Sequence, residues 1–293
     1  MMEIGFIGLG VMGSRMTTRL VESGYEVIIY NRTKEKMTPL LNKGAKAAAS
    51  IEELSKQVDI VCTCLSMPKD VEEVYERVFQ HANADTICVD FTTVGMDTSQ
   101  KLAERAKGKG ISFLDAPISG GPEGAEAGTL TIMVGGDKQA FEKVHPMFKV
   151  LGEKVEHLGK SGMGTVAKLM NQYLVAVHSL AASEAMVVGT ALGLQSEQLF
   201  DILKVSYGDS RMLRRHMEHY VLDRQFEPGG AVKYVHKDVK LANELMTEAG
   251  LPKYTGNMAE EAFQIAIDKG LANEDMSAVI KPLEKQSGTI VKK

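Results

Sequence analysis

The sequence predicts an α/β domain built on a mostly parallel sheet at residues 1–162, followed by an all-helical domain at residues 163–293. Three observations predict this division. Short apolar runs alternate with amphipathic segments in the first half, which is typical of βαβ units. A glycine-rich turn joins the first apolar run to the first amphipathic segment. After Gly162, helical segments follow one another without a convincing strand.

The elements of the first domain are predicted in order along the chain. Its strands are apolar runs bounded by glycine or polar residues, as expected for strands buried in a parallel sheet. They are predicted at residues 3–8, 25–30, 58–65, 86–91, 112–117 and 128–136. The helices are predicted at residues 11–23, 34–44, 70–79, 99–110 and 137–151. Gly24 is well placed to end the first helix.

The second domain is predicted to contain helices only. Their ranges are residues 163–193, 196–206, 212–222, 232–249 and 256–270. The first of these helices is interrupted by polar side chains at Lys168, Asn171, Gln172, His178 and Glu184. Because no uncharged apolar run of about 18 residues exists, we expect a buried helix and no membrane partner.

The composition is that of an ordinary soluble protein. The chain has 293 residues, of which 44% are hydrophobic and 25% charged, with a net charge of −4. Because it carries no basic stripe, we expect no nucleic-acid partner. The cysteines Cys62, Cys64 and Cys88 fit neither a disulfide framework nor a zinc site, so we expect buried free thiols and no metal. The apolar start lacks a basic region, which favours a cytoplasmic protein.

A G-x-G-x-x-G pattern occupies the turn after the first strand. It consists of Gly8, Leu9, Gly10, Val11, Met12 and Gly13. Because it follows a strand and opens a helix, it has the context that dinucleotide binding requires, and a plain glycine turn is the less favoured alternative. Gly8 permits the tight turn, Gly10 lets the backbone approach a pyrophosphate, and Gly13 allows close packing of helix on strand. The helix N-terminus offers N–H groups to the phosphates.

The residues after the second strand bear on which cofactor is bound. An NAD-selective site usually has an acid there, whereas this chain has Asn31, Arg32 and Thr33. Asn31 can bond a hydroxyl without repelling a phosphate, and Arg32 can pair with a 2′-phosphate. NADP is therefore favoured over NAD. The alternative is that these residues only cap the next helix, and both roles can hold together.

A serine and two glycines, Ser119, Gly120 and Gly121, follow the predicted strand at residues 112–117. Open α/β sheets bind ligands beyond the carboxyl ends of their strands. A hydroxyl with successive backbone N–H groups forms a small cradle for an anion, so we expect a carboxylate there. The alternative is a loop of ordinary turn residues.

Lys168 and Glu184 carry the only formal charges between residues 163 and 194. Burying a lysine is costly unless it is paired. Asn171 and Gln172 follow it at i+3 and i+4 on the same helix face. An ammonium that reaches a substrate oxygen can give or take its proton, and amides can hold that oxygen. The alternative is a lysine that extends its ammonium to water.

These motifs, in this order and at this spacing, resemble the β-hydroxyacid dehydrogenase family, which includes 3-hydroxyisobutyrate dehydrogenase, tartronate semialdehyde reductase and 6-phosphogluconate dehydrogenase. The resemblance rests on GFIGLGVMG, DFTTV, DAPISGG, GMGTVAKLMNQ and KYVHKDVKLA, and it covers nearly the whole chain. It implies a Rossmann-type dinucleotide-binding domain, a long interdomain helix, and a helical C-terminal domain like that of 6-phosphogluconate dehydrogenase. It also implies a homodimer or homotetramer.

The resemblance assigns roles to residues on the cofactor side of the site. Thr93 corresponds to a residue near the nicotinamide, and Lys237 to a lysine at the cofactor. We also expect Leu65 and Ser66, at the end of the predicted strand 58–65, to contact the cofactor.

On the substrate side, Ser119, Gly120 and Gly121 correspond to the carboxylate-binding loop. Lys168 corresponds to the catalytic acid/base. The accompanying amide is Asn171 or Gln172, with Asn171 slightly favoured, and Asp238 corresponds to an acid that supports the site. Without the resemblance, Lys237 and Asp238 would read as a solvated charge pair.

Two positions depart from the family pattern. Decarboxylating members have a glutamate where this chain has Val175, so we expect no loss of carbon dioxide. Relatives often carry a bulky residue near the substrate where this chain has Gly230. A roomier pocket is the expectation, and a simple turn at Gly229–Gly230 is the alternative.

The sequence therefore predicts hydride transfer between NADP or NAD and a small hydroxycarboxylate, similar to 3-hydroxyisobutyrate, or its semialdehyde. Two other classes stay open. An imine reductase would share the architecture, but its lysine position is usually replaced. A catalytically inactive dinucleotide-binding module is the second alternative.

Overall fold

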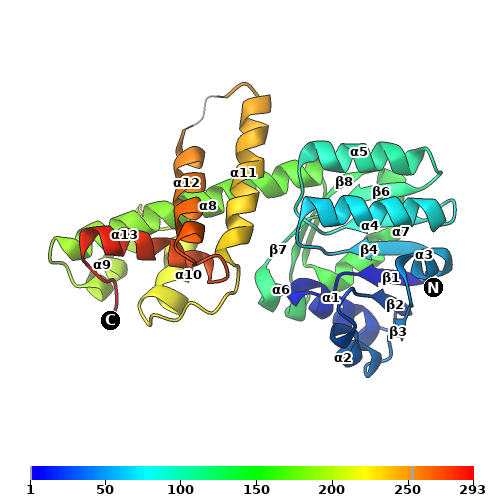
Figure 1. The fold of residues 1–293 in the computed structure, drawn as a ribbon, viewed down its shortest axis with the longest axis horizontal. Helices are drawn as coiled ribbons and strands as arrows, with labels where there is room; N and C mark the ends of the chain where they lie inside the picture. The colour runs from blue at the N-terminus through cyan, green and yellow to red at the C-terminus, as the bar shows by residue number, and fades with distance from the viewer. Residues whose placement is uncertain (1, 252–253) are drawn as a thin grey trace. The chain divides into compact units, whose positions relative to one another are not determined.

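The structure, a computed structural model, describes residues 2–251 and 254–293 of the chain. The chain forms two compact units, one ending at Lys168 and the other beginning at Leu169. An α/β unit holds the N-terminus and a helical unit holds the C-terminus (Figure 1). The predicted fold class is thus confirmed, while the domain boundary predicted between residues 162 and 163 stays a prediction.

The α/β unit is built on one sheet with the strand order β3-β2-β1-β4-β5-β6-β8-β7, and β9 pairs with β8. The strands are β1 (Ile4–Ile7), β2 (Val27–Tyr30), β3 (Lys46–Ala47), β4 (Ile60–Thr63), β5 (Ile87–Asp90), β6 (Ser112–Asp115), β7 (Ile118–Ser119), β8 (Thr131–Gly136) and β9 (Lys154–His157). The first six strands pair in parallel. The strand order reverses between β1 and β4, which is where open α/β sheets bind ligands.

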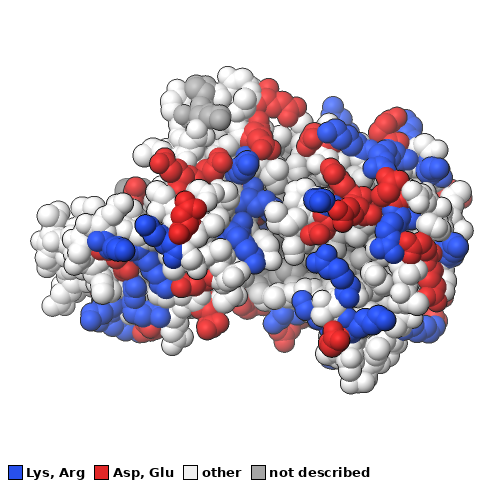
Figure 2. All heavy atoms as spheres, viewed as in Figure 1, with Lys and Arg blue, Asp and Glu red and all other residues white. Residues whose placement is uncertain are grey.

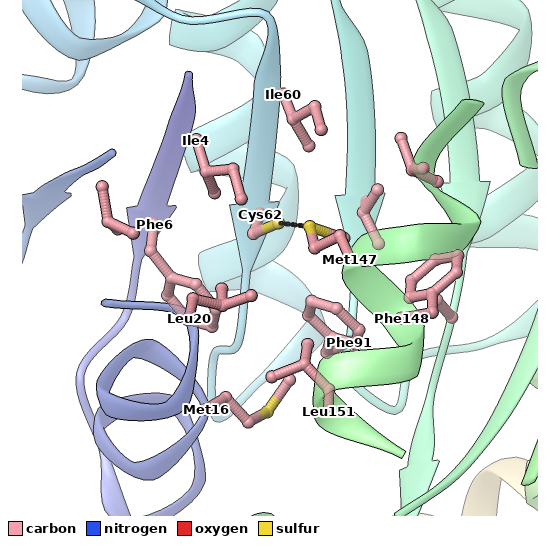
Figure 3. Packing of buried hydrophobic residues seen from close by; sticks show 14 of the residues in the cluster. Ile4, Phe6, Met16, Leu20, Ile60, Cys62, Phe91, Met147, Phe148 and Leu151 are labelled. Atoms are coloured by element: carbon pink, nitrogen blue, oxygen red, sulfur yellow. Dashed lines mark hydrogen bonds between the residues drawn. The ribbon is translucent and has the colours of Figure 1, made fainter. Parts of the chain in front are cut away.

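Helices cover both faces of this sheet. They are α1 (Val11–Glu22), a 3₁₀ turn (Lys34–Met37), α2 (Thr38–Leu41), α3 (Ile51–Gln57), α4 (Pro68–His81), α5 (Met96–Lys107), α6 (Gly121–Ala127) and α7 (Lys138–Leu151). One apolar core lies under α1 and α7, and the other under α3, α4 and α5. Figure 3 shows the first core, where side chains from β1 and β4 point toward those of α1 and α7.

The cysteines belong to this packing. Cys62 and Cys88 are buried and Cys64 is partly buried, all as free thiols. The Sγ atom of Cys62 lies 3.7 Å from the Sδ atom of Met147 (Figure 3). Burial raises the pKa of Cys64 to about 12, and raises the pKa of Cys62 and Cys88 further. The thiols therefore stay protonated at neutral pH, as expected for cysteines that pack as small apolar side chains.

The second unit is helical in the part of the chain that the structure describes. Its helices are the remainder of α8 (Met163–Ala191), α9 (Ser196–Leu203), α10 (Arg211–His216) with a π-helical turn (Met217–Val221), α11 (Val232–Glu248), α12 (Thr255–Asp268), a 3₁₀ turn (Met276–Val279) and α13 (Ile280–Ser287). Its apolar core includes Ala176, Val235, Val239 and Phe263, from α8, α11 and α12. The face of the molecule in Figure 2 carries interspersed basic and acidic side chains.

Some elements differ from the sequence prediction. Strands β3, β7 and β9 and helices α3, α6 and α13 are additional, and the predicted helix at residues 212–222 ends in a π-helical turn. Strand β8 runs antiparallel to β6 and β7, so the sheet is mixed at the edge where these three strands lie.

Candidate functional site

The three glycines of the turn after β1 are each explained by a different structural feature. Gly8 has a φ of +98°, and a Cβ there would overlap the backbone oxygen of Cys64. A Cβ at Gly13 would overlap the backbone oxygen of Gly8, so helix α1 packs directly on the turn. A Cβ at Gly10 would meet nothing within 4 Å, so this glycine faces open space. This is the arrangement that the approach of a pyrophosphate to the backbone requires.

The N-terminus of α1 is suited to bind an anion. Its N-cap residue is Gly10, no side chain caps the helix, and its first turn has no acidic residue. The first N–H groups of a helix have no partner within the helix, and the helix dipole favours negative charge there. The residues of this turn therefore fit the phosphates of a dinucleotide.

Asn31 connects the glycine turn to the loop after β2 by hydrogen bonds. Its Oδ1 accepts a hydrogen bond of 2.9 Å from the N–H of Leu9, and its Nδ2 donates to the backbone oxygen of Thr33 at 2.8 Å. The sequence did not reveal this contact, because the partners lie in different βα turns. Arg32 and Thr33 are exposed beside it.

A buried network connects the loops that follow β4 and β5. The Oγ1 of Thr63 and the N–H of Thr92 both donate to Oδ1 of Asp90, at 2.7 and 3.0 Å. The N–H of Leu65 donates in turn to the Oγ1 of Thr92 at 2.9 Å. Asp90 is 1% exposed, and burial raises its pKa to about 6. Asp90 thus holds together two loops to which the sequence assigns cofactor contacts, and its role was not predicted.

The outer parts of these loops are more accessible. Leu65 and Thr93 are partly buried, and Ser66 is exposed. They follow the carboxyl ends of the adjacent strands β4 and β5, on the same side of the sheet as the glycine turn.

The turn at Ser119 has the backbone conformation of a tight cradle. Ser119 ends β7, and Gly121 begins α6. Gly120 and Gly121 have φ values of +138° and +66°, which residues other than glycine rarely adopt. Ser119 and Gly121 are partly buried and Gly120 is exposed. The structure thus places a hydroxyl and consecutive N–H groups together at the start of a helix.

Lys168 lies on α8, with 8% of its surface exposed. Asn171 follows three residues later on the same helix, which places the two side chains on one helix face. This burial disfavours the alternative of a lysine that only extends its ammonium to water.

In the second unit, α8 and α11 are joined by a chain of polar contacts. Asn171 donates from Nδ2 to Oε1 of Gln172 at 3.0 Å, and Gln172 donates from Nε2 to Oδ2 of Asp238 at 2.5 Å. The ammonium of Lys237 lies 3.0 Å from Oδ1 of Asp238. Asp238 is buried and Lys237 partly buried, so the pair is not a solvated surface pair.

The neighbourhood of Gly230 favours the alternative of a simple turn, while the roomier pocket stays a prediction. A Cβ at Gly230 would lie 2.5 Å from the Cε of Met276, so that direction is already filled. The N–H groups of Gly229 and Gly230 both donate to Oδ2 of Asp275 at 3.1 Å. Arg215 donates to both carboxylate oxygens of Asp275, at 2.9 and 2.7 Å. The two glycines therefore form a turn before α11 that is held by hydrogen bonds to Asp275.

Among the described residues, no three His, Cys, Asp or Glu side chains are grouped as a metal site would need.

Comparisons with known proteins cover both units. A family model described as the NAD binding domain of 6-phosphogluconate dehydrogenase matches residues 3–159. Another, described as NAD-binding of NADP-dependent 3-hydroxyisobutyrate dehydrogenase, matches residues 162–283.

Individual relatives match along nearly their full length. The chain is 36% identical to 2-(hydroxymethyl)glutarate dehydrogenase of Eubacterium barkeri, over 99% of this chain and 97% of that protein. It is 33% identical to the mitochondrial 3-hydroxyisobutyrate dehydrogenase of Drosophila melanogaster, over 98% of this chain and 91% of that protein. A solved structure of Mycobacterium tuberculosis 3-hydroxyisobutyrate dehydrogenase with L-serine has a TM-score of 0.89 at 30% identity, covering 97% of this chain and 99% of that one.

Proposed function

The chain belongs to the β-hydroxyacid dehydrogenase family, and we propose that it oxidises a small carboxylate with a hydroxymethyl group on the neighbouring carbon, or reduces the corresponding semialdehyde. It is an NAD(P)-dependent oxidoreductase that acts on CH–OH groups. The names of the relatives support the substrate class. 3-Hydroxyisobutyrate, 2-(hydroxymethyl)glutarate and L-serine all share this unit and differ in the third substituent on the same carbon.

The cofactor would be held by the turn at residues 8–13 and the loops beyond β4 and β5. Its nicotinamide supplies the hydride acceptor or donor when it is bound. The open space at Gly10 and the N-terminus of α1 fit the pyrophosphate. Leu65, Ser66, Thr93 and Lys237 are the further contacts we propose.

We favour NADP over NAD because no acid follows β2. The Asn31 carboxamide is neutral, and the exposed Arg32 guanidinium suits a 2′-phosphate. Thr33 offers a hydroxyl beside them. The bond from Leu9 N–H to Asn31 Oδ1 couples this recognition to the glycine turn.

The substrate carboxylate would be bound by the hydroxyl of Ser119 and the N–H groups of Gly120 and Gly121. Lys168 would take the hydroxyl proton in oxidation and return it in reduction. Asn171 would hold the reacting oxygen. Gln172 is engaged with both Asn171 and Asp238, so we assign it to orient Asn171.

Asp238 would support this arrangement from α11. Its oxygens are divided between the amide of Gln172 and the ammonium of Lys237, which fixes both side chains. Because Val175 replaces the acid of the decarboxylating members, the product would keep its carboxylate.

The observation that carries this proposal is a lysine with 8% of its surface exposed on the same helix face as an amide. The experiment is turnover of a panel of hydroxymethyl carboxylates with NADP⁺ and with NAD⁺. We expect oxidation of at least one of them. Reduction of cyclic imines without oxidation of any hydroxy acid would favour an imine reductase, and no turnover at all would favour a dinucleotide-binding module.

We propose a cytoplasmic homodimer or homotetramer without nucleic-acid or membrane partners. The second unit exposes large apolar side chains just after α8, on α9 and just after α9, at Leu192 (83%), Ile202 (63%) and Val205 (80%), respectively. Large apolar side chains that are contiguous on a surface mark interaction sites, and we propose that these side chains contribute to the subunit interface. Among the described residues, α8 is the one helix whose length and composition would suffice to cross a membrane. A monomer in light scattering of the purified protein would contradict the oligomer.

A further inference from the structure

Asp115, the last residue of β6, caps a helix that begins far away in the sequence. Its Oδ1 accepts a hydrogen bond of 2.8 Å from the N–H of Gly162, and its Oδ2 one of 2.8 Å from the N–H of Thr165. Both N–H groups lie at the start of α8, where the helix itself offers no acceptor. One carboxylate therefore satisfies two of these donors, and its negative charge is favoured by the helix dipole.

Two further contacts hold the first turn of α8 against the sheet. Gly164 has no side chain, and a Cβ there would overlap the backbone oxygen of Met133 and lie 2.9 Å from the N–H of Gly135. The hydroxyls of Ser99 and Thr165 form a buried hydrogen bond of 2.9 Å. The start of α8 is thus fixed against β6, β8 and α5, all within the first unit.

The same aspartate also begins the segment that leads to the carboxylate cradle. Asp115 pairs with Gly135 of β8, and Ser119 pairs with Thr131 of the same strand. The segment between them is short and buried. The residue that caps the helix of Lys168 is therefore also the first residue of the segment that leads to the cradle, and β8 pairs with both ends of this segment.

Lys168 follows Thr165 by three residues, so it lies one turn beyond the capped N–H on the same side of α8. Any shift of the first turn relative to β6 is passed on to the lysine side chain. Alignment of reacting groups is sensitive to small displacements, and a shift of about 1 Å can cost about a hundredfold in rate.

We propose that Asp115 is a positioning residue, which sets the ammonium of Lys168 relative to the carboxylate cradle at residues 119–121. This inference rests on the proposed function, because it concerns the alignment of the lysine with the bound substrate. Asp115 is buried and both of its carboxylate oxygens accept backbone N–H groups, so it would act through α8 and not on the substrate itself.

The test compares Asp115→Ala with a matched cap in the same unit. Asp137 caps α7 by accepting a hydrogen bond of 2.8 Å from the N–H of Ala140, and we assign no site residue to α7. Both alanine variants lose a helix cap, and both are expected to lower the melting temperature. We expect Asp115→Ala to lower kcat by about 10- to 100-fold with unchanged affinity for NADPH, measured by fluorescence titration, whereas Asp137→Ala keeps the wild-type kcat.

A second variant, Asp115→Asn, tests the same role by kcat and NADPH affinity if the alanine variant does not fold. An amide oxygen can accept one of the two N–H groups, while the amide NH₂ opposes the other. We therefore expect a kcat between those of the wild type and Asp115→Ala, again with unchanged affinity for NADPH.

Wild-type kcat in folded Asp115→Ala or Asp115→Asn would overturn the inference, as would an equal loss of kcat in Asp137→Ala. Failure of the proposed function would look different. In that case the wild type itself would oxidise none of the hydroxymethyl carboxylates, and the positioning role would fall with it.

Discussion

Asp90, the last residue of β5, is a buried ionisable group, and its burial has a measurable consequence for stability. Its carboxyl is 1% exposed and accepts hydrogen bonds from Thr63 and Thr92. These bonds lower the pKa, but burial outweighs them and raises it to about 6 from 3.8. In Asp90→Asn, the amide oxygen can keep both donors without a charge that has to be buried.

The sign and size of the effect follow from proton linkage. At low pH the carboxyl is protonated in both the folded and the unfolded chain, so it makes no difference. As pH rises from about 4, the unfolded chain releases the proton first, and the wild type loses stability until pH passes about 6. Over the whole window, the loss amounts to about 3 kcal/mol. The stability of Asp90→Asn does not fall in this way, because its side chain carries no carboxyl that ionises.

The assay is urea unfolding followed by far-UV circular dichroism, at about pH 5 and about pH 8, with hydrogen exchange of β4 and β5 amides as a local probe. We expect the stability of Asp90→Asn relative to wild type to increase by more than about 1 kcal/mol between these values. The control is Asp70→Asn, which makes the same change at a partly exposed position of α4. A constant difference in stability between Asp90→Asn and wild type at both pH values would show that burial of Asp90 does not raise its pKa in the folded chain.

The remaining predictions concern the cofactor. Gly10→Ala should keep the wild-type melting temperature, because its Cβ meets nothing within 4 Å. The variant should weaken NADPH binding in a fluorescence titration. Unchanged affinity would show that the pyrophosphate does not bind at this turn. Asn31→Asp with Arg32→Leu should shift kcat/KM toward NAD, because a carboxylate repels a 2′-phosphate and can still accept the Leu9 N–H. A wild-type kcat/KM already higher for NAD than for NADP would contradict this preference before the variant is made.

The sequence could predict the elements whose signal is local. Strands β1, β4 and β5 are continuous apolar runs, and the turn at residues 8–13 carries its own pattern. Strands β3 and β9 escaped prediction because their residues are largely polar and exposed, so they show no run of buried positions. Strand β7 has two residues, which is too short for any periodicity.

The sequence could predict site residues where residue type and spacing are informative, as at Lys168 and Ser119, and the roles of these residues stay predictions. Asn31, Asp90 and Asp115 act through partners in other loops, and Asp115 lies 47 and 50 residues from the N–H groups that it caps. Such pairings depend on the register of the sheet, which no local pattern encodes. At Gly230, the missing side chain suggested space, but the tertiary packing places Met276 there.

We propose that Lys168 performs proton transfer in a hydride-transfer reaction on a hydroxymethyl carboxylate. The most direct measurement is kcat of Lys168→Met against wild type, followed by the absorbance of reduced nicotinamide, with the best substrate of the panel. Methionine has a similar volume without the charge, and Lys160→Met, an exposed lysine before α8, is the matched control. We expect kcat to fall at least about a hundredfold in Lys168→Met, with cofactor affinity retained, and to stay at the wild-type value in Lys160→Met. Near-wild-type kcat in Lys168→Met would contradict it.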